Sequence, residues 1–399
     1  MIVAFDTWVL KSSHRNSGIY NYAKNILKAF RAPAALGDDV TMRLFFTPRY
    51  SDGAVDFSSS PGMEIIPTRL LQLHRLWQLG GVTAAAARSH ADLIFSPTTH
   101  TCPLGPIPVI TTIHDVTPVL SPSFSRLPNL LERIRIRNAA KFSVKCITDS
   151  QCSKKDLVET YGLAADKVAV VHLGYDQEIF NDLPADSAKQ KSLMARHGIR
   201  QPYIFHHSVL QPRKNLVRLI QACSALWSQR RLQDFPLVLA GPLGWNYEPI
   251  LEAANKSGFA DQIIFTQALP DEDLATLLKG ASLCVIPSLY EGFCLPMVEA
   301  MACGTPTIAA AASCLPEISG GVLRYFDPLS IEGIADAIAT ALEDSALRRQ
   351  LSEAGITRAS DFSWTRCAAE TLAVLASSQQ QRIGHNGHNG NGRRSLAFR

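Results

Sequence analysis

Short apolar runs alternate with amphipathic segments along most of the 399-residue chain. Seven runs of strand length occur in the first half, at residues 2–5, 42–46, 63–66, 92–96, 108–113, 146–149 and 168–173. Six more follow, at residues 203–209, 236–241, 262–267, 283–288, 305–310 and 322–326. Alternation of strands with helices favours parallel sheets covered by helices on both faces. The polar stretch 181–202 predicts a partly helical linker, so we expect two doubly wound α/β domains.

Composition narrows the class of protein. Apolar residues make up 46% and charged residues 19%, as in folded soluble chains. A net charge of +4 is too small to indicate nucleic-acid binding, but it suits anionic ligands or an acidic membrane surface. Nine cysteines without a C-x-x-C pair are typical of buried thiols in a reducing compartment. The start, MIVAFDTWVL, reads as a strand and not as a signal peptide, so we expect a cytoplasmic protein.

The stretch SLYEGFCLPMVEAMACGTP, residues 288–306, places two glutamates around a predicted helix start. Pro296 suits the first helical turn, where a missing N–H costs nothing. The preceding residues then lie at a helix N-terminus, which favours a phosphate. Glu299, one turn in, can accept hydrogen bonds from a ribose diol, and Glu291 can do the same for a sugar. In the alternative interpretation, Glu299 only complements the helix dipole and Glu291 is a surface charge.

Two further motifs follow predicted strands. In LQPRKNL, residues 210–216, Arg213 can clamp a phosphate bidentately and Lys214 adds a point charge. Two doubly wound domains leave a cleft at the carboxyl ends of their strands, where such sheets bind ligands. In TTIHDVTP, residues 111–118, His114 lies where it can face this cleft, and Asp115 either caps the loop or orients the imidazole. The alternatives are solvated charges before a helix and a structural histidine.

Two weaker signals complete the set. Gly18, within RNSGIYNYAKNIL, opens a predicted helix after the first strand, so its backbone donors face the same cleft. The only literal D-x-D, Asp271 to Asp273, begins a helix after Pro270, and acidic capping explains it better than metal binding. We therefore expect no metal requirement.

Taken together, these motifs resemble glycosyltransferase family 4. E-G-F-C-L-P-M-V-E-A is similar to the family's E-x7-E signature, and P-R-K-N-L resembles its phosphate loop. I-H-D in the first half and F-S-W (residues 362–364) before a late helix are also similar. The motifs occur in the family's order over roughly residues 1–375.

The resemblance implies a GT-B fold of two Rossmann-like domains and a retaining transfer from a nucleotide diphosphate sugar. By motif, Glu299 would bind the donor ribose, Glu291 the transferred sugar, and Arg213 and Lys214 the diphosphate. Backbone amides of Phe293, Cys294 and Leu295 would contact sugar and phosphate, His114 would face the reacting sugar, and the loop at Gly241 would contact the nucleotide base.

The implied domains are an acceptor-side domain, residues 1–182, and a donor domain, residues 183–362. A helix at 363–376 would cross back onto the first domain, and the H-N-G-rich tail, 377–399, is predicted to be disordered.

Three residues depart from the family pattern. Cys294 and Ser208 stand where glycine is usual, and Tyr20 stands where a second glycine is common. A cysteine at a position of positive φ is less favourable than glycine.

The expected donor is GDP-mannose, with UDP-glucose next, and the expected acceptor is a glycan or a polyprenyl-linked sugar. The basic segment 126–145 predicts either a solvated surface helix or contact with an anionic membrane, at the inner face of the plasma membrane. Two other functions stay open: another GT-B enzyme, such as a phosphorylase or a nucleotide-sugar epimerase, and a catalytically silent sugar-nucleotide binding protein.

Overall fold

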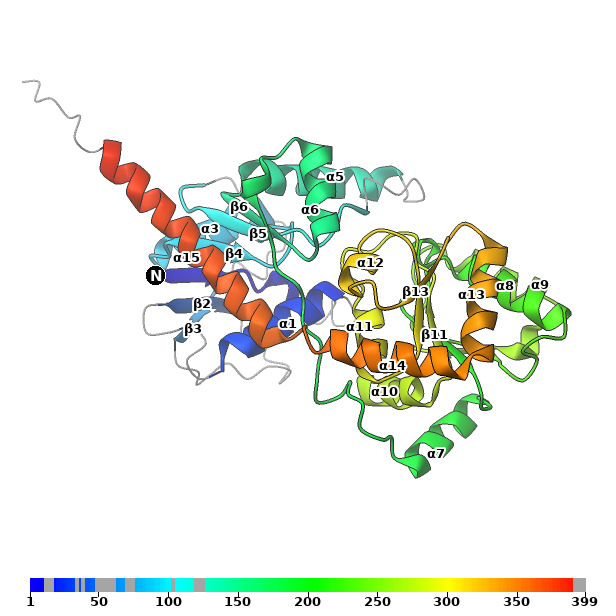
Figure 1. The fold of residues 1–399 in the computed structure, drawn as a ribbon. Coiled ribbons are helices and arrows are strands. Elements are labelled where there is room, and N and C mark those ends of the chain that lie inside the picture. The colour runs from blue at the N-terminus through cyan, green and yellow to red at the C-terminus, as the bar shows by residue number, and fades with distance from the viewer. Residues whose placement is uncertain are drawn as a thin grey trace, which may run out of the picture.

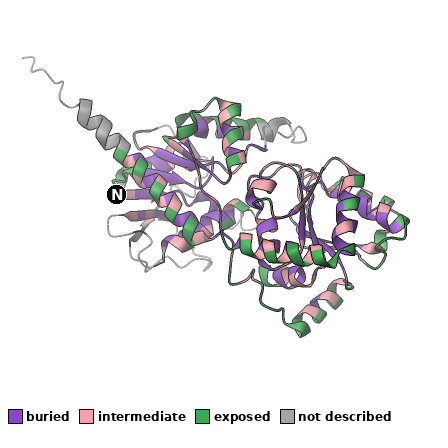
Figure 2. Ribbon diagram, viewed as in Figure 1, coloured by how far each residue is buried: buried purple, intermediate pink, exposed green. Residues whose placement is uncertain are grey.

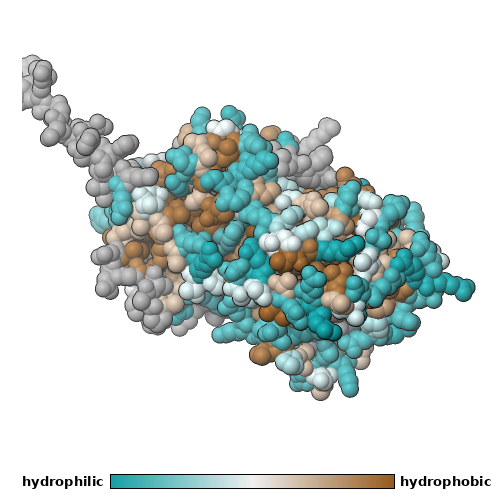
Figure 3. Space-filling view, viewed as in Figure 1, coloured by the Kyte–Doolittle hydropathy of each residue, from teal (hydrophilic) through white to brown (hydrophobic). Residues whose placement is uncertain are grey.

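A computed structural model describes residues 1–10, 18–32, 36, 40–46, 62–68, 76–101, 105–117 and 126–389. Its elements form two sheets, each covered by helices, as Figure 1 shows. Both sheets are parallel throughout, and their central strands are buried (Figure 2). Hydrophobic and hydrophilic residues are interspersed over the outer face drawn in Figure 3.

The first sheet has the strand order β3-β2-β1-β4-β5-β6-β7. Its strands are β1 (Ile2–Phe5), β2 (Thr41–Phe46), β3 (Met63–Pro67), β4 (Leu93–Ser96), β5 (Val109–Thr112), β6 (Lys145–Thr148) and β7 (Val168–Val170). Its main helices are α1 (Gly18–Phe30), α3 (Val82–Arg88), α5 (Arg126–Phe142) and α6 (Gln151–Tyr161). The strand order changes direction between β1 and β4. Sheets of this kind bind ligands at such a switch point, beyond the carboxyl ends of the strands.

The second sheet has the order β10-β9-β8-β11-β12-β13. Its strands are β8 (Ile204–His207), β9 (Leu237–Ala240), β10 (Ile263–Gln267), β11 (Leu283–Ile286), β12 (Thr307–Ala310) and β13 (Arg324–Phe326). Its helices are α7 (Ser187–His197), α8 (Leu216–Ser228), α9 (Glu248–Lys256), α10 (Asp271–Gly280), α11 (Leu295–Ala302), α12 (Leu315–Ile318), α13 (Ile331–Glu343) and α14 (Ser345–Ala359). All thirteen predicted strands are present, because buried parallel strands are continuous apolar runs.

The last helix returns to the first domain. α15 (Trp364–Asn389) packs against α1 and β4, so the chain crosses between the domains twice, once after β7 and once before α15 (Figure 1). The two connecting segments are in direct contact: a Cβ added to Gly174 would lie 2.1 Å from the backbone nitrogen of Trp364. α15 continues to Asn389, whereas the sequence analysis placed the end of this helix at residue 376. Residues 390–399 lie outside the described part of the chain.

Candidate active site

A cavity of about 1150 Å³ lies between the two sheets, at the carboxyl ends of their strands. Every residue that the sequence motifs single out for donor binding or catalysis lines it: Gly18, His114, Arg213, Lys214, Gly241, Glu291, Phe293, Cys294, Leu295 and Glu299. Residues 15–17 of the first glycine motif lie outside the described residues. The lining therefore combines both domains in one site.

Glu291 is the centre of the charged part of this site. It is only 4% exposed, and its two carboxylate oxygens accept hydrogen bonds from Arg213 and from the Lys214 ammonium group. Burial alone would raise the pKa of Glu291, but the two cations outweigh burial and lower it to about 2. Glu291 is therefore ionised at neutral pH. It also fixes both cations at the cavity wall.

The loop that carries the cations is held by Asn215. Pro212–Lys214 forms a short 3₁₀ turn after β8, and Asn215 ends that turn in the left-handed conformation, at φ 60°. Asparagine tolerates this conformation better than most residues. Its amide donates to the carbonyl oxygens of Pro287 (3.0 Å) and Pro328 (2.7 Å). The asparagine of the P-R-K-N motif thus holds the loop against the segments that follow β11 and β13.

Helix α11 begins at the cavity, as the motif predicts. Its N-cap residue, Cys294, has φ 74°, and Pro296 lies in the first turn. Position 294 is therefore one where glycine would be less strained than cysteine. Burial raises the pKa of the Cys294 thiol to about 12, so this side chain stays a neutral thiol.

Glu299 lies one turn into α11 and has a partner that the sequence analysis did not single out. His207, at the end of β8, donates from Nε2 to Glu299 Oε2 at 2.9 Å. A carboxylate retains lone pairs beyond this one bond and can still accept from hydroxyl groups. Asp271, at the start of α10, also lines the cavity. Burial and the nearby Glu299 raise the pKa of Asp271.

His114 is held from both sides of its ring. Nδ1 contacts Asp149 Oδ2 at 2.7 Å and Nε2 contacts the carbonyl oxygen of Pro97 at 3.2 Å. Both partners are acceptors, so the doubly protonated ring satisfies both contacts. Burial lowers the pKa of His114, but the Asp149 carboxylate outweighs burial and raises it. Asp115 instead caps the loop, accepting from the Thr117 backbone N–H at 2.9 Å.

Asp149 was missed by sequence reasoning although a signal existed. It follows β6, the neighbour of β5, and His114 follows β5. The carboxyl ends of adjacent parallel strands meet at one edge of a sheet. An acid and a histidine just beyond two neighbouring strand ends are therefore close in space, but the neighbour relation comes from the fold.

The two domains touch at the edge of the cavity. Gly292, between the two glutamates, lies so close to the first domain that a Cβ there would be 2.4 Å from the carbonyl oxygen of His114. The Ser153 hydroxyl donates to the carbonyl oxygen of His114 at 3.2 Å and lies 3.4 Å from that of Gly292. The motif loops of the two domains are thus in direct contact.

No group of three or more histidine, cysteine, aspartate or glutamate side chains is arranged to hold a metal ion in the part of the chain that the structure describes. Across the same residues, no helix combines the length and the apolar character needed to cross a bilayer.

The chain matches two family models. Residues 16–179 match the model described as Glycosyltransferase Family 4, and residues 189–358 match the one described as Glycosyl transferases group 1. The boundary between the two matches falls after the first sheet and before β8, so each model covers one domain.

Curated relatives agree with these matches. An O-antigen chain mannosyltransferase B of Escherichia coli is 28% identical over 72% of this chain and 75% of its own length. The serotype-specific mannosyltransferase WbdA of E. coli is 32% identical over 59% of this chain, but the match spans only 29% of WbdA.

Solved structures share the fold. HepE from Anabaena, crystallised with UDP and glucose, superposes with a TM-score of 0.71 at 21% identity, over 94% of this chain and all of HepE. WaaG, a glycosyltransferase involved in lipopolysaccharide biosynthesis, superposes with a TM-score of 0.66 at 15% identity, over 93% of this chain and 99% of WaaG. The predicted pair of doubly wound domains is confirmed, and the chain belongs to the family 4 glycosyltransferases of the GT-B fold.

Proposed function

We propose that the protein transfers a hexose from a nucleoside diphosphate sugar to a glycan or lipid-linked acceptor in polysaccharide biosynthesis, with retention of the anomeric configuration. One observation carries the proposal. Two cations, Arg213 and Lys214, converge with the N-terminus of α11 on one cavity wall, and Glu299 lies one helical turn away. This wall matches a diphosphate next to a ribose diol.

The main barrier to transfer is separation of the diphosphate from the anomeric carbon. Positive groups fixed before the reaction stabilise the charge that develops on the leaving group. Arg213 and Lys214 supply that charge, and Glu291 fixes their positions. The proposed chemistry therefore assigns charge neutralisation to the chain's own groups and requires no metal. His114 faces the same space from the first domain and is assigned to the reacting sugar.

The proposed donor is GDP-mannose, from which mannose would be transferred. Its support is the names of relatives: two E. coli mannosyltransferases, and an MMP alpha-(1->4)-mannosyltransferase of Mycolicibacterium hassiacum that is 32% identical over 60% of this chain. UDP-glucose is the second candidate because HepE was crystallised with it, at 22% identity to this chain. The cavity wall beside Gly241, with Pro242, Leu269 and Pro270, offers a place for the nucleotide base.

Calorimetric titration of the purified protein with GDP, UDP and ADP tests the donor site. We expect GDP to bind most tightly and Glu299→Ala to weaken that binding at least about tenfold, because hydrogen bonds to a charged group contribute about 1.5–3 kcal/mol. Glu343→Gln, which alters a surface carboxylate paired with Arg231, is the control and should leave binding unchanged. Equal binding by wild type and Glu299→Ala would remove Glu299 from the donor site, and absence of nucleotide binding would contradict the proposed function.

We further propose that α5 brings the enzyme to an anionic lipid surface. Leu130, Leu131 and Ile134 are exposed on this helix, Leu131 by 58%, while Ile136 is buried and belongs to the core. The same helix carries Arg133, Arg135, Arg137 and Lys141. Basic groups beside exposed apolar side chains match an anionic headgroup layer.

Sedimentation with vesicles tests this contact. We expect the protein to pellet with phosphatidylglycerol-containing vesicles at low salt, to be released at high salt, and to ignore neutral phosphatidylcholine vesicles, since the attraction is screened by salt. Leu131→Ser combined with Ile134→Ser should reduce pelleting. Protein that stays in the supernatant with anionic vesicles at low salt would rule out this surface.

A further inference from the structure

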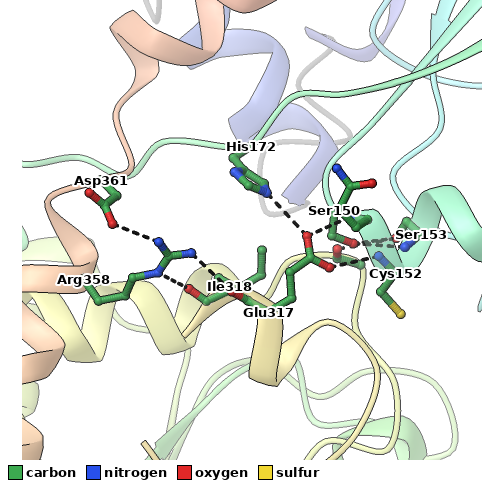
Figure 4. Close-up of polar contacts among 10 residues, drawn as sticks. Ser150, Cys152, Ser153, His172, Glu317, Ile318, Arg358 and Asp361 are labelled. Atoms are coloured by element: carbon green, nitrogen blue, oxygen red, sulfur yellow. Dashed lines mark hydrogen bonds and ion pairs between the residues drawn. The ribbon is translucent and has the colours of Figure 1, made fainter. Parts of the chain in front are cut away.

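A carboxylate of the second domain caps a helix of the first. Glu317, in α12, accepts hydrogen bonds from the backbone N–H groups of Gln151 (2.7 Å) and Cys152 (2.9 Å). These are the first two residues of α6. Figure 4 shows Glu317 beside Cys152. The free N–H groups of a first helical turn, at the positive end of the helix dipole, favour such an anion. Ser150, the N-cap residue, uses its own side chain for Ser153 N–H.

The glutamate is anchored firmly on its own domain. Arg358, from α14, donates to the carbonyl oxygens of Ile318 (2.7 Å) and Glu317 (3.2 Å) and pairs with Asp361 at 2.8 Å (Figure 4). Asp361 lies just before the chain returns to the first domain. His172, in the other crossing, lies 3.5 Å from Glu317 Oε1. The contact therefore joins α6 to the region where the chain crosses between the domains.

Glu317 is held in its ionised form. Burial would raise the pKa of this carboxyl, but the hydrogen bonds from His172, Gln151 N–H and Cys152 N–H outweigh burial and lower it. The carboxylate is therefore a permanent anion at neutral pH. This is the form that caps a helix N-terminus most effectively.

The first turn of α6 leads directly to the cavity. Ser153, next after Cys152, bridges His114 and Gly292, which line the cavity from opposite domains. Phe293, also in the cavity wall, packs edge-on against Phe362 at 5.3 Å and lies 6.1 Å from the ring of His172. Movement of α6 away from α12 would therefore separate the two motif loops.

We propose that Glu317 is a positioning residue that latches the two domains in the arrangement that closes the cavity. Among the described residues, its side-chain hydrogen bonds go to Gln151, Cys152 and His172, which do not line the cavity, and it acts through α6. The interpretation of its effect on turnover rests on the proposed function, but the latch itself does not. Donor binding should depend little on it, because Arg213, Lys214 and Glu299 all lie in the second domain.

The test compares Glu317→Gln with Glu343→Gln in the full chain by amide hydrogen exchange. Glutamine has one carbonyl oxygen for two N–H donors, and its own NH₂ group cannot accept. We expect exchange at Gln151 and Cys152 to become about tenfold faster in Glu317→Gln, the factor that one hydrogen bond to a charged group contributes. Glu343→Gln, which removes only a surface pair with Arg231, should exchange like wild type. Unchanged exchange in Glu317→Gln would overturn the latch.

Two further readouts separate a latch from a general loss of structure. We expect Glu317→Gln to bind nucleotide with a Kd within about twofold of wild type while turnover falls about tenfold. Gly292→Ala opens the same contact from the other side, because its Cβ would lie 2.4 Å from the His114 carbonyl oxygen, and it should also speed exchange at Cys152. Equal loss of binding and turnover would indicate a structural role and contradict the proposal. If neither the wild type nor any variant transfers sugar, the proposed function is wrong. The hydrogen-exchange result still tests the latch in that case.

Discussion

An Arg213→Ala enzyme is expected to turn over roughly two to three decades more slowly than wild type, because loss of one fixed donor to a developing anion costs about 3–4 kcal/mol of transition-state stabilisation. The structure supports this size of effect. Arg213 is held at the cavity wall by the Glu291 carboxylate and by the carbonyl oxygen of Tyr290 at 3.0 Å. Steady-state kinetics with saturating donor and acceptor measure it.

The matched control is Arg231→Ala, which removes an arginine of the same domain from a surface pair with Glu343. Its turnover should equal that of wild type. Arg213→Lys should recover part of the loss, since lysine keeps the charge but not the planar pair of donors. Turnover of Arg213→Ala within a few fold of wild type would defeat the assignment of Arg213 to the leaving group.

Glu291→Gln is expected to lower the free energy of unfolding by about 3–5 kcal/mol, as removal of one partner from a buried ion pair does. The carboxylate is 4% exposed and is shared by two cations, so its loss removes the anion that both Arg213 and Lys214 are paired with. Urea denaturation of both proteins at pH 7 gives the difference. Glu252→Gln, on the exposed surface of α9, is the control and should change stability little.

The stability difference between wild type and Glu291→Gln should depend on pH. The pKa of Glu291 is lowered from 4.5 to about 2 on folding, so its stabilising contribution is complete above pH 4.5 and is lost as pH falls toward 2. The stability difference between wild type and Glu291→Gln should therefore shrink as the pH is lowered through this range. A difference that stays constant from pH 6 to pH 3, or a variant as stable as wild type, would contradict the ion-paired state.

The strand positions, and the motif residues of the site, can be predicted from short segments of the sequence. Parallel strands buried on both faces are continuous apolar runs, so their positions can be read without knowing their neighbours. Arg213 and Lys214, and the pair Glu291 and Glu299, each lie within one strand–loop–helix unit. Their placement at strand ends therefore follows from the order of elements alone.

The partners of these residues are not local. His207 meets Glu299, and Asp149 meets His114, because β8 lies beside β11 and β6 beside β5. Glu317 meets α6 only because the two domains face each other. The sequence also did not predict the continuation of α15 beyond residue 376, because Gly384, Asn386, Gly387 and Asn389 near its end have low helix propensity.

Product analysis with GDP-mannose and UDP-glucose, in the presence of a mannosylated lipid-linked acceptor, tests the central claim most directly. We expect stoichiometric release of nucleoside diphosphate and a glycoside whose anomeric configuration, read by NMR coupling constants, is that of the donor. Cleavage that needs free phosphate would indicate a phosphorylase, and an altered sugar formed without acceptor would indicate an epimerase. Either result, an inverted product, or donor binding without any turnover would contradict the account.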